Sequence, residues 1–300
     1  SLKPAKKVYS SSAFLDSCKE VVVENKKYIQ LGGTLGRGAS SSVRRVVSLK
    51  TGDLYAYKRV DIRSSCVDDA EEVFESYANE INLLKQCKGS DYIIDLIASE
   101  VNKNDMFVAM VMEMGEVDLA TSISHQKKAY ASSHPNSSKV NPFYMRMVWE
   151  RMLLAVDHIH EHRIVHGDLK PANFVFVRGE LKLIDFGISK EISSDTTNIV
   201  RHGLIGTVNY MAPEAVMPSV IPPPECSDDD NDQSAASGSI IKHGRASDIW
   251  SLGCILYQML YGKTPFASFR NTHQKVAMIT NPKADIQFPV IDEQLGVDAA

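Results

Sequence analysis

One polar stretch of the chain, VHGDLKPANF at residues 165–174, holds three side chains that could do chemistry together. Asp168, Lys170 and Asn173 fall within six positions of a loop that follows a helix-patterned run. An aspartate can orient a hydroxyl nucleophile and accept its proton, and a lysine can neutralise charge on a transferred phosphoryl group. The asparagine offers a neutral amide oxygen to a hard cation. This combination indicates phosphoryl transfer to a hydroxyl.

A further carboxylate follows in LKLIDFGIS, a strand-like run that ends in Asp185, before Phe186 and Gly187. A carboxylate at a strand end is either a cap or a metal ligand. Asp185 and Asn173 together would suit Mg²⁺, a hard cation that takes oxygen ligands. The sequence therefore offers two oxygen-bearing side chains as candidate metal ligands.

The stretch LGRGASSSV contains Gly36-x-Gly38, with Ser41 where a third glycine often stands. Alone this is a weak signal, because most such matches are ordinary turns. A dinucleotide-binding fold would place a helix after the glycines, but strand-like alternation continues here through Val43. A glycine loop that closes a β-hairpin can still lay backbone N–H groups over phosphates.

Lys58, in the next strand-like run, is on its own most simply a surface lysine. Glu80 argues for more. It shares one stripe of a predicted helix with the apolar positions 73, 77 and 84, and a buried carboxylate needs a partner. Lys58 is the natural candidate. A lysine held by a glutamate and facing a glycine loop is an arrangement for gripping nucleotide phosphates.

The elements that must hold these residues change character along the chain. Residues 1–27 show little periodicity and are interpreted as a lead-in extension. From Tyr28 onward short strand-like runs alternate with turns, and a helix is predicted over 71–86. Beyond Gly115 long helical patterns cover 143–161 and 245–261. We therefore expect a small β-rich N-terminal lobe joined near 113–116 to a larger helical lobe.

A Pro-, Ser- and Asp-rich insert at about 217–242 has the composition of a solvated loop. The net charge of −4 over 300 residues gives no reason to expect nucleic acid or an anionic membrane as a partner. Five scattered cysteines without a C-x-x-C pair fit a reduced cytosolic or nuclear protein better than a secreted one. Apolar runs are far short of a membrane span.

Taken in order, these residues form a set that resembles the signature of eukaryotic protein kinases. The set comprises Gly36-x-Gly38, Lys58, Glu80, His166-Gly-Asp168-x-Lys170-x-x-Asn173, Asp185-Phe-Gly187 and Ala212-Pro213-Glu214. The further stretches DTTNIV, GTVNYMAPEA and SDIWSLGCILYQMLYGKTPF are similar to the monopolar-spindle (TTK) family of dual-specificity checkpoint kinases. Paired Thr196-Thr197 and a non-arginine before Asp168 are its more specific marks. The resemblance covers about residues 28–290.

The resemblance implies an α+β, two-lobed protein-kinase fold. Residues 1–27 would be an extension, 28–112 the β-rich N-lobe with one main helix, 113–116 the hinge, and 117–300 a mostly helical C-lobe. The chain stops soon after QFPVIDEQ. The last C-lobe helices, and the arginine that usually pairs with Glu214, are therefore expected to be missing from a truncated C-lobe.

The resemblance also assigns roles for ATP and Mg²⁺. Asp168, Lys170, Asn173 and Asp185 would be catalytic, the last two as metal ligands. Met112 would be the gatekeeper beside the adenine, backbone groups of Glu113 and Gly115 would meet the base, and Asp248 would brace the catalytic loop. The full nucleotide-binding set would be Leu35, Gly36, Gly38, Val43, Ala56, Lys58, Glu80, Met112, Glu113 and Gly115.

The implied activity is phosphorylation of Ser, Thr and potentially Tyr hydroxyls on proteins, with Thr196, Thr197 and Thr207 as regulatory residues. Kinetochore proteins as partners, a nuclear or cytoplasmic location at the kinetochore or spindle, and transient self-association for trans-autophosphorylation follow from the family only. Two alternatives stay open. One is a pseudokinase scaffold, which would normally lack Lys58, Asp168 or Asp185, and the other is a Ser/Thr kinase of another family.

Overall fold

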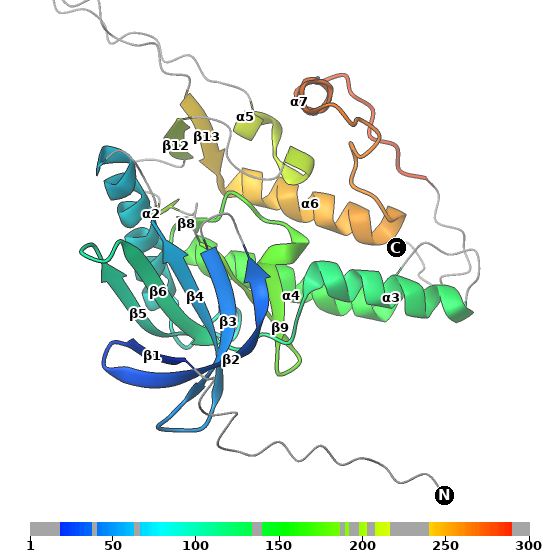
Figure 1. Ribbon diagram of the computed structural model, residues 1–300. Coiled ribbons are helices and arrows are strands. Elements are labelled where there is room, and N and C mark those ends of the chain that lie inside the picture. The colour runs from blue at the N-terminus through cyan, green and yellow to red at the C-terminus, as the bar shows by residue number, and fades with distance from the viewer. Residues whose placement is uncertain are drawn as a thin grey trace, which may run out of the picture. The chain divides into compact units, whose positions relative to one another are not determined.

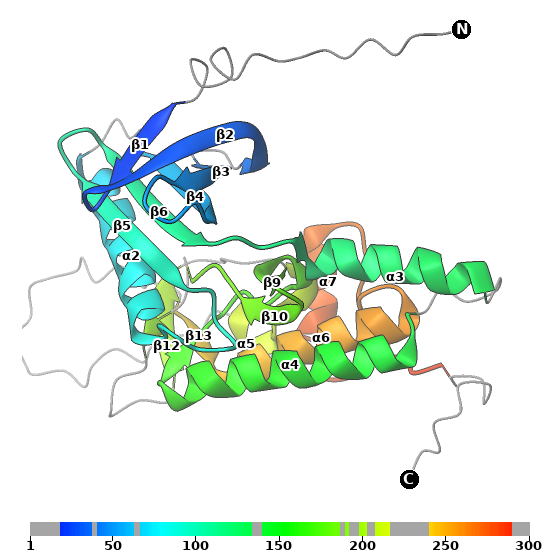
Figure 2. The same cartoon turned by 90° about the horizontal axis from the view of Figure 1, so that it is seen from below.

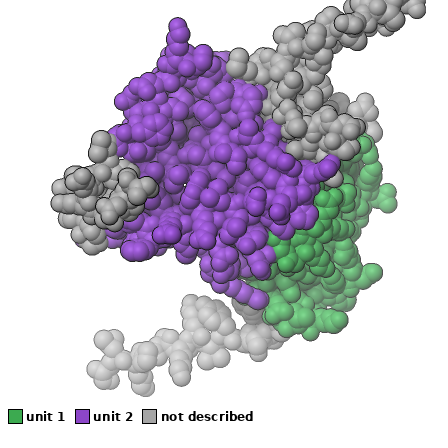
Figure 3. Space-filling model, turned by 180° about the vertical axis from the view of Figure 1, so that it is seen from behind, with its two compact units in different colours: residues 1–90, 94–115 green, residues 91–93, 116–300 purple. Residues whose placement is uncertain are grey.

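The computed structural model describes residues 19–37, 41–62, 67–133, 140–186, 190–191, 198–202, 208–216 and 240–289. The chain forms two compact units (Figure 3). Unit 1 comprises residues 1–90 and 94–115, and unit 2 comprises residues 91–93 and 116–300. The chain leaves unit 1 after Gly115, inside the range predicted as the hinge. Among the described helices, none has the length and apolar character that a membrane crossing requires.

Unit 1 is built on one antiparallel six-stranded sheet of order β1-β2-β3-β4-β6-β5 (Figure 1). Alternating side chains of these strands are buried, and Val23, Val46, Tyr57 and Val111 belong to one core cluster. The strands are β1 Glu20–Val23, β2 Lys26–Arg37, β3 Ser41–Ser48, β4 Leu54–Asp61, β5 Leu96–Asn102 and β6 Phe107–Glu113. Helix α2 (Val67–Gln86) contacts β5 and β6.

The start of unit 1 differs from the prediction of a lead-in over residues 1–27. Residues 20–27 belong to the sheet, because Glu20–Val23 pairs with β2 through a two-residue turn. Val21 and Val23 point into the core, and the turn residues Glu24 and Asn25 have positive φ values of 49° and 60°. Two such residues in a two-residue loop match the right-handed twist of the strands. Residues 1–18 lie outside the described residues.

Helix α2 begins before the predicted residue 71 and buries a slightly different stripe. Phe74, Ile81 and Leu84 are almost fully buried. Val73, which we expected on the buried face, is 37% exposed. The prediction was wrong by one residue because Phe74 offers a larger apolar surface and stands about two helical turns before Ile81, on the same face. Glu80 lies on the buried face, as predicted.

Over the residues that the structure describes, unit 2 is mostly helical and carries three small sheets. Its helices are α3 Leu119–Ser133, α4 Pro142–Glu161, α5 Pro213–Val216, α6 Arg245–Tyr261 and α7 Thr272–Ile279. Helices α4 and α6 lie side by side (Figure 2). The short strands are β7 Val117–Asp118, β8 Ile164–Val165, β9 Phe174–Val177, β10 Glu180–Leu183, β11 Lys190–Glu191, β12 Asn198–His202 and β13 Ile240–Gly244. They pair as β10-β9-β7, β11-β8 and β12-β13.

The two long helices of unit 2 have clear local causes. Asn141 caps α4 by accepting a hydrogen bond from Phe143 N, and Pro142 occupies the first turn, where its missing N–H costs nothing. One face of α4 is buried. Helix α6 ends at Gly262, whose φ of 80° allows the chain to turn away. Both helices form where helical periodicity predicted them.

The insert predicted over about 217–242 contains a strand at its end. Residues 240–242 belong to β13, which pairs antiparallel with β12 in the register Asn198 with Gly244 and His202 with Ile240. The loop prediction is therefore wrong for 240–242. Two adjacent isoleucines there favour an extended chain, and backbone pairing with β12 satisfies its N–H and C=O groups. Residues 217–239 lie outside the described residues.

Candidate active site

The loop between β8 and β9 brings together the three side chains with which the sequence analysis began. Lys170 Nζ donates to Asp168 Oδ2 at 2.5 Å. Asn173 Nδ2 donates to the backbone oxygen of Asp168 at 2.9 Å, and Asn173 is 4% exposed. The short helix η1 (Pro171–Asn173) turns the chain so that Asn173 reaches back to Asp168. Since the amide NH₂ is used in this way, Asn173 has its Oδ1 as an acceptor for a cation.

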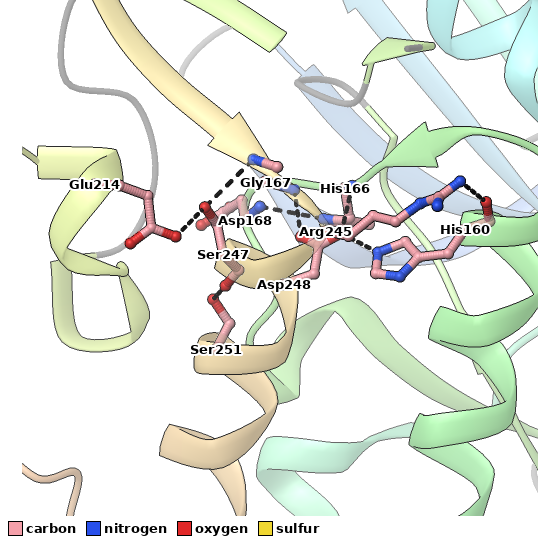
Figure 4. Close-up of polar contacts among 10 residues, drawn as sticks. His160, His166, Gly167, Asp168, Glu214, Arg245, Ser247, Asp248 and Ser251 are labelled. Carbon is pink, nitrogen blue, oxygen red and sulfur yellow. Dashed lines mark hydrogen bonds and ion pairs between the residues drawn. The ribbon is translucent and has the colours of Figure 1, made fainter. Parts of the chain in front are cut away.

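Asp248, the first-turn aspartate of α6, holds this loop, as the resemblance to protein kinases implied (Figure 4). Its Oδ2 accepts hydrogen bonds from His166 N and His160 Nε2, both at 2.9 Å. Its Oδ1 accepts from Gly167 N at 2.8 Å. Asp248 has no exposed surface. A buried carboxylate that accepts three N–H groups is well satisfied, so it fixes the backbone directly before Asp168.

His166 links the loop to the strand that carries the second aspartate. Its Nδ1 accepts from Asp168 N at 3.2 Å, so the ring proton belongs on Nε2, which lies 3.4 Å from Ile184 O. The ring is fully buried and its centroid is 5.6 Å from that of Phe186. His166 therefore connects the backbone before Asp168 with the backbone before Asp185.

Glycine at position 167 has a backbone reason. Its φ is +76°, in the left-handed region that residues with a β-carbon adopt at a cost. This conformation directs Gly167 N at Asp248. A basic residue at position 167, which the sequence lacks, would have to adopt the same left-handed backbone conformation.

Asp185 follows β10 and is exposed, with a φ of +66°. Ile184 N donates to Asn173 O at 2.8 Å, which places the residue before Asp185 against Asn173. Phe186 is fully buried. Asn173 and Asp185 present oxygen atoms, the donors that Mg²⁺ takes, so the pair fits a divalent cation whose other ligands come from phosphate and water. Among the described residues no cluster of three or more His, Cys, Asp or Glu could hold a metal by itself.

Unit 1 contains the predicted lysine–glutamate pair. Lys58 Nζ lies 2.9 Å from Glu80 Oε1 and 3.3 Å from Oε2. The side chain of Glu80 is 2% exposed and that of Lys58 is 16% exposed. The ammonium also lies 5.3 Å from the centroid of the Tyr77 ring. The lysine on β4 is thus oriented by α2, as predicted.

The other predicted nucleotide-binding residues of unit 1 lie on β2, β3, β4 and β6. Gly36 pairs with Val43 across β2 and β3, and Leu35 is exposed beside it. Ala56 on β4 is opposite Met112 on β6, so the predicted gatekeeper stands two residues away from Lys58 along the paired strand. The small side chain of Ala56 is buried.

The end of β6 limits how the chain can contact a base. Glu113 N donates to Asp95 O at 3.0 Å, and Asp95 N donates to Glu113 Oε2 at 3.0 Å. Because its N–H is used, an adenine contact by Glu113 would use the carbonyl oxygen. Gly115 is the last residue of unit 1.

Five predicted residues lie outside the described residues: Gly38, Gly187, Thr196, Thr197 and Thr207. Two that matter for the described geometry were missed. His160 was assigned no role in the site, and its Nε2 donates to Asp248 Oδ2. Ser247 was not considered, and its Oγ donates to Glu214 Oε1 at 2.7 Å. The sequence signal for these two residues was weak, because helical spacing does not show which other elements of the fold a helical side chain will contact.

The model of the protein kinase domain matches residues 29–294. The chain is 44% identical over 271 residues to "Serine/threonine-protein kinase mph1" of Schizosaccharomyces pombe, which covers 90% of this chain and 36% of that protein. It is 39% identical over 287 residues to "Dual specificity protein kinase TTK" of Mus musculus, covering 95% of this chain and 30% of that protein.

A third relative is "Serine/threonine-protein kinase MPS1" of Saccharomyces cerevisiae, 37% identical over 288 residues, with 96% of this chain and 34% of that protein covered. The chain therefore spans about a third of the length of these relatives.

Proposed function

Because this chain belongs to the protein kinase domain family, we propose that it transfers the γ-phosphoryl group of ATP to serine and threonine hydroxyls of proteins. The observation that carries the proposal is the bonded set Asp168, Lys170 and Asn173, with its backbone held by Asp248. The names of the relatives, which include a dual-specificity kinase, extend the proposal to tyrosine hydroxyls. The alternative of an inactive scaffold has less support, since Lys58, Asp168 and Asp185 are all present.

In this proposal each catalytic side chain of unit 2 has one task. Asp168 orients the acceptor hydroxyl and takes its proton as the oxygen forms a bond to the γ-phosphorus. The bond from that phosphorus to the β–γ bridging oxygen breaks, and ADP leaves. Lys170, 2.5 Å from Asp168, places positive charge beside the group in transfer.

In unit 1, Lys58 contacts the phosphates of ATP while Glu80 keeps the ammonium oriented. Asn173 and Asp185 would hold Mg²⁺, which would supply charge neutralisation at the phosphates. The family supports use of ATP and a divalent metal in general, and the choice of Mg²⁺ rests on these oxygen ligands.

From the resemblance to the monopolar-spindle (TTK) family we propose a role in mitotic spindle checkpoint signalling, with kinetochore proteins as partners and a kinetochore or spindle location. Self-association for trans-autophosphorylation belongs to the same proposal. Imaging of a tagged full-length protein in dividing cells tests the location. Absence from kinetochores and spindles throughout mitosis would contradict it.

Radiolabelled ATP and a generic basic protein test the activity, with Asp168→Asn as the comparison. The wild type should label the acceptor only when Mg²⁺ is present. Asp168→Asn should lose on the order of a thousandfold, because it removes the group that orients the hydroxyl. Asp157→Asn, an exposed residue of α4, serves as the matched control. Equal labelling by wild type and Asp168→Asn would mean that Asp168 plays no part in the transfer.

A further inference from the structure

Residues 208–216 form a segment that is fastened to two helices of unit 2. Ser251 Oγ of α6 donates to Tyr210 O at 2.7 Å, and Tyr210 Oη donates to Gln258 Oε1 at 2.8 Å. Lys275 Nζ of α7 donates to Asn209 Oδ1 at 2.5 Å. Burial raises the pKa of the Tyr210 phenol, which therefore stays a donor. The segment thus has a fixed place on α6.

The same segment contributes to an apolar cluster. Met211, Ala212, Ala215 and Val216 are buried together with side chains of α7 and of the chain that precedes it. Trp250 of α6 packs against this cluster. Apolar packing is not directional, so it resists removal of the segment but allows small sliding. Hydrogen bonds at defined atoms are what set its register.

The first turn of α6 touches both this segment and the catalytic loop. Ser247 Oγ donates to Glu214 Oε1 at 2.7 Å, and the next residue, Asp248, accepts the backbone N–H groups before Asp168. Figure 4 shows Glu214 on one side of this turn and the catalytic loop on the other. Ser247 is 3% exposed. Two adjacent helical residues therefore tie the two functional segments to one rigid element.

Ser247 has a second, weaker bond that must be separated from the first. Its Oγ accepts from Gly244 N at 3.4 Å, a contact that caps the start of α6. Loss of the hydroxyl would remove both bonds. Loss of the Glu214 carboxylate would remove one and leave the cap intact. The two roles of Ser247 can therefore be told apart by experiment.

We propose that Ser247 is a positioning residue for the acceptor protein. By holding Glu214 it sets the register of segment 208–216 relative to Asp168, and so the place of the hydroxyl that receives the phosphoryl group. This rests on the proposed kinase function and assigns the segment to acceptor binding. The hydroxyl–carboxylate bond joins Ser247 Oγ to Glu214 Oε1. It is a charge-assisted bond with one exposed partner, so its effect is graded rather than absolute.

The test is steady-state kinetics with one acceptor peptide, measured for wild type, Ser247→Ala, Glu214→Ala and the double variant. Each single variant should raise KM for the peptide about tenfold and leave KM for ATP unchanged. The double variant should be no worse than either single one, because both remove the same contact. Ser132→Ala, which removes an exposed helical hydroxyl of α3, should behave as wild type.

Three outcomes would overturn the proposal. A silent Glu214→Ala beside an impaired Ser247→Ala would show that Ser247 acts only as a helix cap. Additive effects in the double variant would separate the two residues. An equal rise in KM for ATP would mean a general structural loss. If Ser247→Ala does not fold, Glu214→Ala carries the test, since its side chain is exposed. A wild type without Asp168-dependent transfer would instead refute the kinase function itself, and the positioning role with it.

Discussion

Two buried carboxylates, Glu80 in unit 1 and Asp248 in unit 2, are neutralised in different ways. Glu80 is 1% exposed and bonds to the ammonium of Lys58, at the end of a flexible four-carbon side chain. Asp248 has no exposed surface and accepts two backbone N–H groups and His160 Nε2. Backbone donors cannot leave without moving the loop, whereas Lys58 can turn to another anion.

This contrast separates a fixed part of the molecule, the loop held by Asp248, from an adjustable part, the Lys58–Glu80 pair. The loop around Asp168 in unit 2 is fixed by a carboxylate that accepts two backbone N–H groups of that loop. Lys58 of unit 1, the proposed phosphate-binding lysine, is oriented by an ion pair between a strand and helix α2, so displacement of α2 would remove this orientation. Regulation is therefore expected to act through Glu80 and not through Asp248.

Removing the Asp248 carboxylate should have the largest effect on stability and activity. Asp248→Ala leaves three buried donors without an acceptor, each costing about 1–3 kcal/mol, so the free energy of unfolding should fall by at least about 3 kcal/mol. Loss of loop geometry should lower kcat at least about a hundredfold. Urea unfolding and phosphoryl transfer measure both, with Asp157→Ala on α4 as control. Normal stability and turnover would show that Asp248 does not hold the loop.

Weakening the Lys58–Glu80 pair should lower the rate of phosphoryl transfer without affecting the fold. Glu80→Gln keeps the shape of the side chain but loses a charged hydrogen bond, so kcat at saturating ATP should fall roughly thirtyfold. Thermal unfolding should shift far less than for Asp248→Ala. Glu75→Gln, exposed on the same helix, is the matched control. An unchanged kcat would remove Glu80 from the mechanism.

Phosphorylation at Thr196 and Thr197 should have a smaller effect, because neither position 167 nor helix α2 before Lys85 offers a basic side chain to bind the phosphate. Gly167 has no side chain, and α2 has no basic residue before Lys85. Replacing both threonines by Ala should lower kcat/KM by about tenfold, the worth of one or two partly exposed charge-assisted bonds. The measurement uses one peptide for all variants. A thousandfold loss, beside a nearly normal Thr207→Ala, would overturn this account of Gly167.

Two buried thiols, one in each unit, allow the unfolding of the two units to be compared without measuring activity. Burial raises the pKa of Cys87 in unit 1 to about 11 and that of Cys254 in unit 2 to about 12. Stability from each protonated thiol is present in full below its unfolded pKa of about 8.5, and is lost as pH rises through the folded value. Pulsed alkylation at pH 8 should spare both until urea unfolds their unit. Rapid labelling without urea would contradict their burial.

The sequence was most informative where charge and burial conflict. Glu80 on an apolar stripe demanded a cation, and Lys58 is that cation. Asp248 was placed by resemblance, and its three donors are as expected of a brace. The strand Glu20–Val23 was missed because its turn residues, Glu24 and Asn25, lack the glycine that marks most two-residue hairpins. The four residues EVVV form too short a strand-like run to outweigh the aperiodic residues before them.

Contacts that depend on tertiary neighbours could not be predicted. Ser247 bonds to Glu214, 33 residues earlier in the chain, and nothing in helical spacing specifies that partner. The pairing of β12 with β13 likewise joins segments on either side of the insert. Short strands have low local propensity signals, and their pairing is decided by the elements around them.

Amide hydrogen exchange tests the contrast between the fixed loop and the adjustable pair most directly. The N–H groups of His166 and Gly167, bound to Asp248, should exchange slowly with and without ATP and Mg²⁺. The amides of α2 should exchange faster without nucleotide and become protected when Lys58 and Glu80 are held together by it. Fast exchange at His166 and Gly167 in the nucleotide-free protein, beside an α2 that is equally protected in both states, would contradict the account.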